Sequence, residues 1–126
     1  MLLAGAGPRA RRADPRGGFG VRSEVAEFFE RWGEEASDIG IEDWILDPGF
    51  GFGKDIADNW ELLENLSELK ACGKPVLVGV SRKRMTYGSA EITEKAHRLA
   101  LEQGADILRV HDVPAARLTL EHFLSE

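Results

Sequence analysis

The sequence is poor in the residues that mark several large classes of protein. It has a single cysteine, Cys72, which excludes an internal disulfide and any metal site built from several cysteines. It has no apolar run of roughly 20 residues, the length that crosses a bilayer, and its opening lacks the basic start and the length of a secretory leader. We therefore expect a cytoplasmic protein with no membrane contact.

Positive charge is also scarce, except in the first 20 positions. The chain has 16 Lys and Arg against 22 Asp and Glu, a net charge of −6. Residues 1–20 contain four Arg and one Asp, so residues 21–126 carry −9. A body this acidic excludes general nucleic-acid binding, because that affinity comes mainly from neutralising phosphates. Residues 1–20 are rich in Gly, Pro, Ala and Arg and cannot bury a core, so we expect a disordered or unrelated head.

The remaining residues show helices that alternate with strands. Apolar residues at spacings of three and four predict helices over residues 21–37, 58–69, 91–103 and 115–124. Continuous apolar runs predict buried strands over residues 44–46, 75–80 and 105–110. This alternation is typical of an α/β domain whose parallel sheet is covered on both faces.

Polar residues follow each predicted strand. Asp47 ends the first strand, the cluster Ser81-Arg82-Lys83-Arg84 follows the second, and Arg109-Val110-His111 ends the third. Both α/β barrels and open α/β sheets build their sites at the carboxyl ends of strands. An eight-unit (β/α)8 barrel needs about 250 residues, so we predict a partial TIM barrel, about the last three βα units of one.

The glycine-rich loop after Asp47 does not match the common nucleotide-binding motifs. Pro48 stands where a phosphate-binding loop has its first glycine, and Asp55 replaces the Ser or Thr that would hold magnesium. Lys54 occupies the place of the third glycine in the dinucleotide-binding pattern. The glycines alone therefore indicate only a tight connection between a strand and a helix.

Asp47 has two interpretations. A carboxylate at the end of a buried strand loses solvation, which is unfavourable unless a donor hydrogen-bonds to it. Asp47 could cap its own turn through Pro48 and Gly49. Alternatively, its two oxygens could accept paired N–H donors from a ligand with a guanidine-like ring edge, in a charge-assisted pair.

The basic residues also have two interpretations. Arg82 and Arg84 are typical of a solvated turn, whereas Lys83 could contact the opposite edge of the same ring if the strand ends converge. Arg109 and His111 alternate onto one side of their strand, which favours an anion site for phosphate or pyrophosphate over a structural His111.

Other histidine chemistry is not favoured. We assign His97 and His122 to the surface or to packing. The chain has neither a Ser-His-Asp order nor a spaced set of His and Glu ligands, so hydrolase and zinc sites have little support.

Three motifs together resemble the C-terminal portion of the dihydropteroate synthases, a pterin-binding family. They are Asp47-Pro-Gly-Phe-Gly-Phe-Gly-Lys54, Gly79-Val-Ser-Arg-Lys83 and Arg109-Val-His-Asp-Val113. No motif alone is specific, whereas their order and spacing together are. The resemblance runs from about residue 21 to the C-terminus, so residues 21–126 are expected to form a partial pterin-binding domain.

The resemblance implies a fold, an activity and residue roles. The family consists of TIM barrels that condense 6-hydroxymethyl-7,8-dihydropterin pyrophosphate with p-aminobenzoate, releasing pyrophosphate and giving 7,8-dihydropteroate. By position, Asp47, Lys83 and Arg109 correspond to pterin contacts, and Arg109 and His111 to pyrophosphate contacts. Phe52 and Lys83 correspond to residues on the p-aminobenzoate side.

The sequence departs from the family in several places. Arg84, on the p-aminobenzoate side, stands where the family usually has Ser, and residues 85–99 are shorter than expected. The family uses Mg²⁺, but its Asn ligand on the first strand has no counterpart here, so no metal ligand is expected in this chain. We expect small-molecule substrates, a possible homodimer, and little turnover by this chain alone. The alternatives are a non-catalytic pterin-binding half-barrel, or a pterin-dependent methyltransferase domain, which the Ser-Arg-Lys and Arg-Val-His motifs disfavour.

Overall fold

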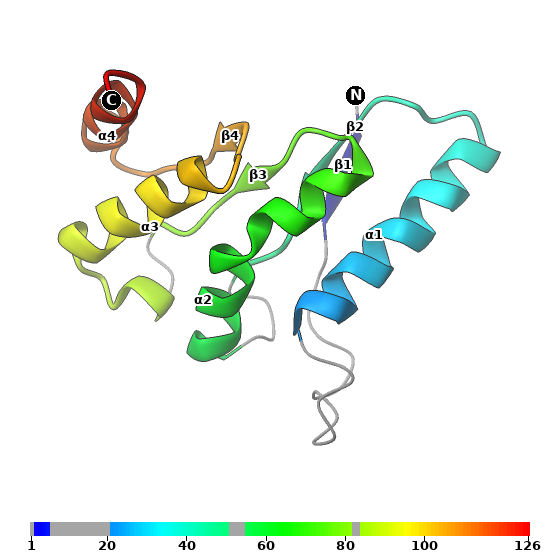
Figure 1. Ribbon diagram of the computed structural model, residues 1–126, viewed down its shortest axis with the longest axis horizontal. Helices are drawn as coiled ribbons and strands as arrows, with labels where there is room; N and C mark the ends of the chain where they lie inside the picture. The colour runs from blue at the N-terminus through cyan, green and yellow to red at the C-terminus, as the bar shows by residue number, and fades with distance from the viewer. Residues whose placement is uncertain (1, 6–20, 51–54, 82–83) are drawn as a thin grey trace.

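Short strands alternate with helices along the chain. The computed structural model describes residues 2–5, 21–50, 55–81 and 84–126 (Figure 1). In chain order the elements are β1 (Leu2–Gly5), α1 (Val21–Asp38), β2 (Trp44–Asp47), α2 (Ile56–Glu64), the 3₁₀ helix η1 (Leu66–Cys72), β3 (Leu77–Val78), the 3₁₀ turn η2 (Arg84–Thr86), α3 (Ala90–Glu102), β4 (Ile107–Leu108) and α4 (Val113–Leu124). Within these ranges, none of the helices combines the length and the apolar character needed to cross a membrane.

The strands lie side by side in chain order and all run parallel. β1 pairs with β2 in a register that sets Gly5 opposite Asp47, and β3 pairs with β4. A parallel bridge between Leu46 and Val76 joins the two pairs. The helices follow the same order, so that α1 lies beside α2, α2 beside α3 and α3 beside α4 (Figure 1). Parallel strands linked by helices in this order form the α/β architecture that the sequence predicts.

β1 corrects the expected organisation of the N-terminus. Residues 1–20 are predicted as a disordered or unrelated head, but Leu2–Gly5 pair with β2 along their whole length. The described residues therefore contain four strands, where the sequence predicts three. The apolar run at the start of the chain was not predicted as a strand, because arginines and glycines dominate the composition of the first 20 residues. Residues 6–20 lie outside the described part of the chain.

One apolar core joins the strands to the helices. Side chains alternate across a strand, and this places Trp44 and Leu46 of β2, and Val78 of β3, in the core. The same core takes Val25, Phe29, Leu62, Leu63, Leu66, Leu69, Ala96 and Ala100 from the helices. The opposite strand face carries partly exposed residues, among them Ile107 of β4 at 37% exposed.

The expectation of helices on both faces of the sheet is therefore wrong for the described residues. The helices α1, α2 and α3 pack on one face of the strands. The polar residues at the carboxyl ends of the strands lie beside the other face. In a (β/α)8 barrel the helices cover only the outer face of the sheet, because side chains from the strands fill the interior. Helices on a single face are therefore compatible with part of such a barrel.

Helix α1 forms as its pattern predicts. Val25, Phe29 and Ala36 are all buried, and they recur at helical spacing along one side. The helix ends before Gly40, whose φ of 85° is the left-handed conformation that glycine favours at a helix end.

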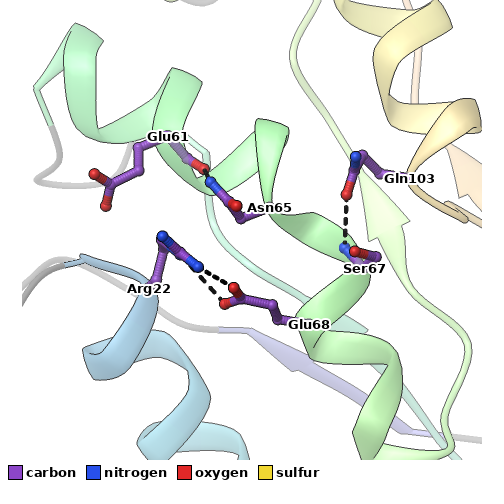
Figure 2. Close-up of polar contacts among 6 residues, drawn as sticks. All are labelled: Arg22, Glu61, Asn65, Ser67, Glu68 and Gln103. Atoms are coloured by element: carbon purple, nitrogen blue, oxygen red, sulfur yellow. Dashed lines mark hydrogen bonds and ion pairs between the residues drawn. The ribbon is translucent and has the colours of Figure 1, made fainter.

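The predicted helix over residues 58–69 is interrupted. The structure has α2, which begins after the Asp55 cap, and then η1, with Asn65 between them. The Asn65 side chain donates to the Glu61 carbonyl at 2.8 Å (Figure 2). Such a side-chain bond to the i−4 carbonyl competes with the regular backbone ladder, which gives a physical reason for the break.

Polar contacts also tie the helical layer together (Figure 2). Arg22 of α1 forms an ion pair with Glu68 of η1, with Arg22 Nε donating to Oε2 at 3.2 Å. That hydrogen bond is the main cause that lowers the pKa of Glu68 and raises the pKa of Arg22. The Ser67 N–H donates to the side-chain oxygen of Gln103 at the end of α3, at 3.1 Å. The Arg22–Glu68 pair is exposed, so it contributes little to stability and mainly orients α1 against η1.

Candidate functional site

The carboxyl ends of β2, β3 and β4 bring charged residues together on the face without helices. Asp47 ends β2, and Arg109 directly follows β4. The Arg109 Nη1 atom lies 3.8 Å from the Asp47 Oδ2 atom, although β3 separates the two strands. Two residues that the sequence predicts as ligand contacts are therefore neighbours in space.

Asp47 makes the turn contact that the sequence allows, and its second oxygen faces a guanidinium of the chain itself. Its residue surface is 8% exposed, and its Oδ1 accepts the Gly49 N–H at 2.9 Å. The turn-capping interpretation is thus confirmed for one oxygen, while the other faces the Arg109 guanidinium. A carboxylate has about four acceptor positions, so these contacts leave capacity for donors from a ligand.

Arg109 and His111 have different surroundings. The Arg109 side chain is 53% exposed and turns toward Asp47. His111 is exposed and lines a cavity between α3 and α4. β4 ends at Leu108, so strand alternation does not extend to His111 and does not decide on which side it lies.

The cluster after β3 is described only in part. Ser81 is 6% exposed, and its hydroxyl shares a 3.3 Å hydrogen bond with the Nε2 atom of His97 on α3. Arg84 is exposed at the start of η2. The predicted contacts Lys83 and Phe52 lie outside the described residues.

The cavity between α3 and α4 has a volume of about 610 Å³, within the range of small-molecule sites. It is lined by Ser81, Gly88, Ser89, Ala90, Glu91, Thr93, Glu94, His97, His111, Asp112, Ala115, Ala116, Leu118, Thr119 and His122. His97 is only 3% exposed, and burial lowers the pKa of its imidazole, so the neutral form dominates at pH 7. The cavity meets the strand-end site at Ser81.

Comparison with known proteins identifies the family. The sequence profile of a family described as pterin binding enzymes matches residues 9–111, which is most of the chain. The chain belongs to the pterin-binding enzymes.

Several dihydropteroate synthases are similar to this chain in both sequence and fold. The dihydropteroate synthase of Haemophilus influenzae is 41% identical over 118 residues, which cover 86% of this chain and 42% of the relative. The crystal structure of dihydropteroate synthase from Thermus thermophilus is 35% identical, with a TM-score of 0.84 over 98% of this chain and 54% of that chain. The enzyme of Xanthomonas albilineans in complex with 7,8-dihydropteroate is 36% identical, with a TM-score of 0.85 over 98% of this chain and 50% of that one. The chain spans about half the length of these relatives.

Two features of this site were not predicted from the sequence. His97 is assigned to the surface or to packing, and it is indeed buried, but its bond to Ser81 could not be foreseen. Gly79 lies beside the Arg109 guanidinium, and an isolated glycine within an apolar strand was the available signal. The described residues contain no group of three or more His, Cys, Asp or Glu that could hold a metal ion.

Proposed function

We propose that this chain forms the pterin-binding side of a dihydropteroate synthase site. That enzyme condenses 6-hydroxymethyl-7,8-dihydropterin pyrophosphate with p-aminobenzoate to give 7,8-dihydropteroate and pyrophosphate. The observation that carries the proposal is the Asp47–Arg109 pair, which joins the ends of β2 and β4 across β3 on the face without helices. The relatives named dihydropteroate synthase support it.

Asp47 would bind the amino-pyrimidine edge of the pterin. This edge presents paired N–H groups, much as the Arg109 guanidinium does, and a carboxylate accepts such a pair with good geometry. Because Asp47 is almost fully buried, its hydrogen bonds compete less with water than those of a surface carboxylate. Its bond from Gly49 fixes the carboxylate before the ligand arrives.

Arg109 and His111 would stabilise the pyrophosphate. The bond from the pterin methylene to the pyrophosphate oxygen breaks in the reaction, so negative charge develops on the departing group. A guanidinium forms two parallel hydrogen bonds to such an anion, and Arg109 is exposed enough to turn from Asp47 toward it. Lys83, Phe52 and Arg84 are proposed for the p-aminobenzoate side, from the resemblance alone.

Magnesium would arrive with the pyrophosphate. When bound, it would share the neutralisation of the departing anion. The described residues contain no group of three or more His, Cys, Asp or Glu that could hold the metal, so the pyrophosphate would supply much of its coordination.

The position in the barrel is also a proposal. We infer that β1 to β4, with the helices that follow them, are consecutive units of a (β/α)8 barrel, because the strands pair in chain order with helices on one face. The predicted number of about three units would then become four.

The Asp47→Asn variant tests the function, because it separates the two contacts of Asp47. An Asn oxygen can still accept the Gly49 N–H, whereas the lost charge removes the strong acceptor for the ligand. We expect Asp47→Asn to bind 6-hydroxymethyl-7,8-dihydropterin pyrophosphate about 10–100-fold more weakly in calorimetry, since a hydrogen bond to a charged group contributes about 1.5–3 kcal/mol. Its melting temperature should stay close to that of the wild type.

The matched control is Asp55→Asn. Asp55 also accepts a backbone N–H, that of Asp58 at 2.7 Å, and it caps α2 outside the strand-end site. It should therefore leave pterin affinity unchanged. If Asp47→Asn binds the pterin as tightly as the wild type, Asp47 is only a turn residue and the proposed role is wrong.

A further inference from the structure

We propose that Gly79 is a positioning residue for the pterin site: the lack of a side chain there opens the path by which the Arg109 guanidinium crosses from β4 to Asp47. The effect on pterin binding rests on the proposed function, whereas the contact between Gly79 and Arg109 is a feature of the described residues. In this role Gly79 acts through Arg109 alone and makes no contact with the substrate.

The distance between strands makes the crossing necessary. Adjacent strands lie about 4.8 Å apart, so β2 and β4 are separated by about 10 Å with β3 between them. The Arg109 N–H donates to the Val78 carbonyl at 2.9 Å, so Arg109 starts level with the end of β3. A guanidinium that starts there reaches Asp47 only by lying over the backbone of β3.

The contact at Gly79 leaves no room for a methyl group. A Cβ atom placed at Gly79 would lie 2.7 Å from Nη2 of Arg109, and 3.0 Å from both Cζ and Nε. All three atoms belong to the planar guanidinium, which therefore rests directly on the glycine. A methyl group at this position would displace the guanidinium from its path, because carbon contacts normally lie near 3.5–4.0 Å.

The glycine is not explained by backbone conformation. Gly79 does not have the positive φ found at Gly40, Gly49, Gly73, Gly88 and Gly104, so alanine can adopt its backbone angles. Its chain neighbours Val78 and Val80 are fully buried. Glycine within such an apolar run weakens a strand, so the space above it is the remaining physical reason for its presence.

The Gly79→Ala variant tests the inference through two separate measurements. In NMR spectra of the full chain, the Arg109 Nε–Hε signal, assigned by its loss in Arg109→Lys, should shift in Gly79→Ala. In calorimetry, affinity for 6-hydroxymethyl-7,8-dihydropterin pyrophosphate should fall at least about tenfold, because the guanidinium proposed to bind the pyrophosphate is displaced from the end of β3. The melting temperature should not fall, since alanine suits a strand better than glycine and the clashing group is the flexible end of a side chain.

Gly33→Ala is the matched control. Gly33 lies within α1, and a Cβ there would meet only the Trp44 ring, at 3.4 Å, which a small shift accommodates. It should change neither the Arg109 signal nor pterin affinity. The Arg109→Lys and Gly79→Ala double variant should bind no more weakly than Arg109→Lys alone, because both changes act on the same guanidinium.

The outcomes separate this inference from the proposed function. An unshifted Arg109 signal in Gly79→Ala overturns the role of Gly79, whatever the binding data show. A shifted signal with unchanged pterin affinity also overturns it as a positioning residue. If the wild type does not bind the pterin at all, the proposed function fails, and the Arg109 signal alone then decides whether Gly79 sets the guanidinium path.

Discussion

The Asp47 carboxylate makes one contact within its own turn and one across the sheet. Its Oδ1 accepts the Gly49 N–H, while its Oδ2 faces the Arg109 guanidinium. The turn contact holds the side chain in place, and the second oxygen is directed toward the strand-end site. A structural role and a binding role are therefore compatible in this residue.

The sequence predicts which residues lie at the site better than it predicts which atoms they contact. Asp47 and Arg109 come at the ends of predicted strands, and these positions alone predict that the two residues lie close together. Gly79 could not be assigned a role in this way, because its importance depends on the angle at which a side chain from β4 crosses β3. The surroundings of His111 also depend on where β4 ends, which no apolar run specifies.

His97 should make stability depend on pH. Burial lowers the pKa of its imidazole, so below about 6.5 the unfolded chain binds a proton that the folded chain excludes. The contribution of the neutral His97 to the free energy of unfolding is therefore fully present well above pH 6.5 and is lost as the pH falls through the lowered pKa. In urea unfolding followed from pH 7 to pH 5, we expect His97→Gln to flatten this decline, because the side chain no longer titrates.

His122→Gln is the control for that measurement. His122 is exposed on α4, so this variant removes an imidazole and leaves the buried Ser81–His97 contact in place. Equal slopes in the wild type and in His97→Gln would show that His97 is protonated as readily in the folded chain as in the unfolded chain.

At the scale of elements, Asp106 fastens the start of β4 to its neighbours. Its Oδ2 accepts both the Val76 N–H at 2.9 Å and the Lys70 ammonium at 2.5 Å. The hydrogen bond from Lys70 is the main cause that lowers the pKa of Asp106. This contribution to stability is present above the ordinary Asp pKa of about 3.9 and is lost as the pH falls through the lowered value.

Replacing Asp106 should destabilise the fold more than replacing its surface partner. Asp106→Ala leaves the N–H of the fully buried Val76 without this acceptor, so we expect a loss of about 1–3 kcal/mol in chemical unfolding. Lys70→Ala removes only a partly exposed ion pair and should lose about 0–1 kcal/mol. Equal losses in the two variants would mean that the backbone contact contributes nothing.

The helices could be predicted more closely than the strands. Apolar spacing placed α1, α3 and α4 within a few residues of their observed bounds, because each buries one continuous stripe. Regular pairing in β3 covers only Leu77–Val78, although the apolar run is longer, since pairing depends on partners far along the chain. The interruption at Asn65 arises from one side-chain bond that an apolar pattern does not reveal.

At the scale of the whole molecule, apolar surface remains on α4 and on the helix-free face. Val113, Leu118 and Leu124 are each more than half exposed, and Ile107 of β4 is 37% exposed. The edge strands β1 and β4 each pair on one side within the described residues. Exposed apolar side chains beside unpaired strand edges favour association between chains.

We therefore expect the 126-residue chain to self-associate, in line with the predicted homodimer. In sedimentation equilibrium, Leu124→Lys should weaken association, because it places a charge within the apolar surface of α4. Ile39→Lys is the control, since Ile39 is similarly exposed, at 74%, but follows α1. The helices α1 and α4 lie at opposite ends of the row of helices (Figure 1). A monomer at all concentrations would contradict this prediction.

The central claim is that the ends of β2, β3 and β4 form one pterin site on the helix-free face. It is tested most directly by titrating the ¹⁵N-labelled chain with 6-hydroxymethyl-7,8-dihydropterin pyrophosphate and following its amide signals by NMR. We predict saturable shifts centred on Asp47, Gly79 and Arg109, and little change in α1. Shifts centred instead on the cavity between α3 and α4, at Glu94 and Leu118, or no saturable shifts at all, would contradict the claim.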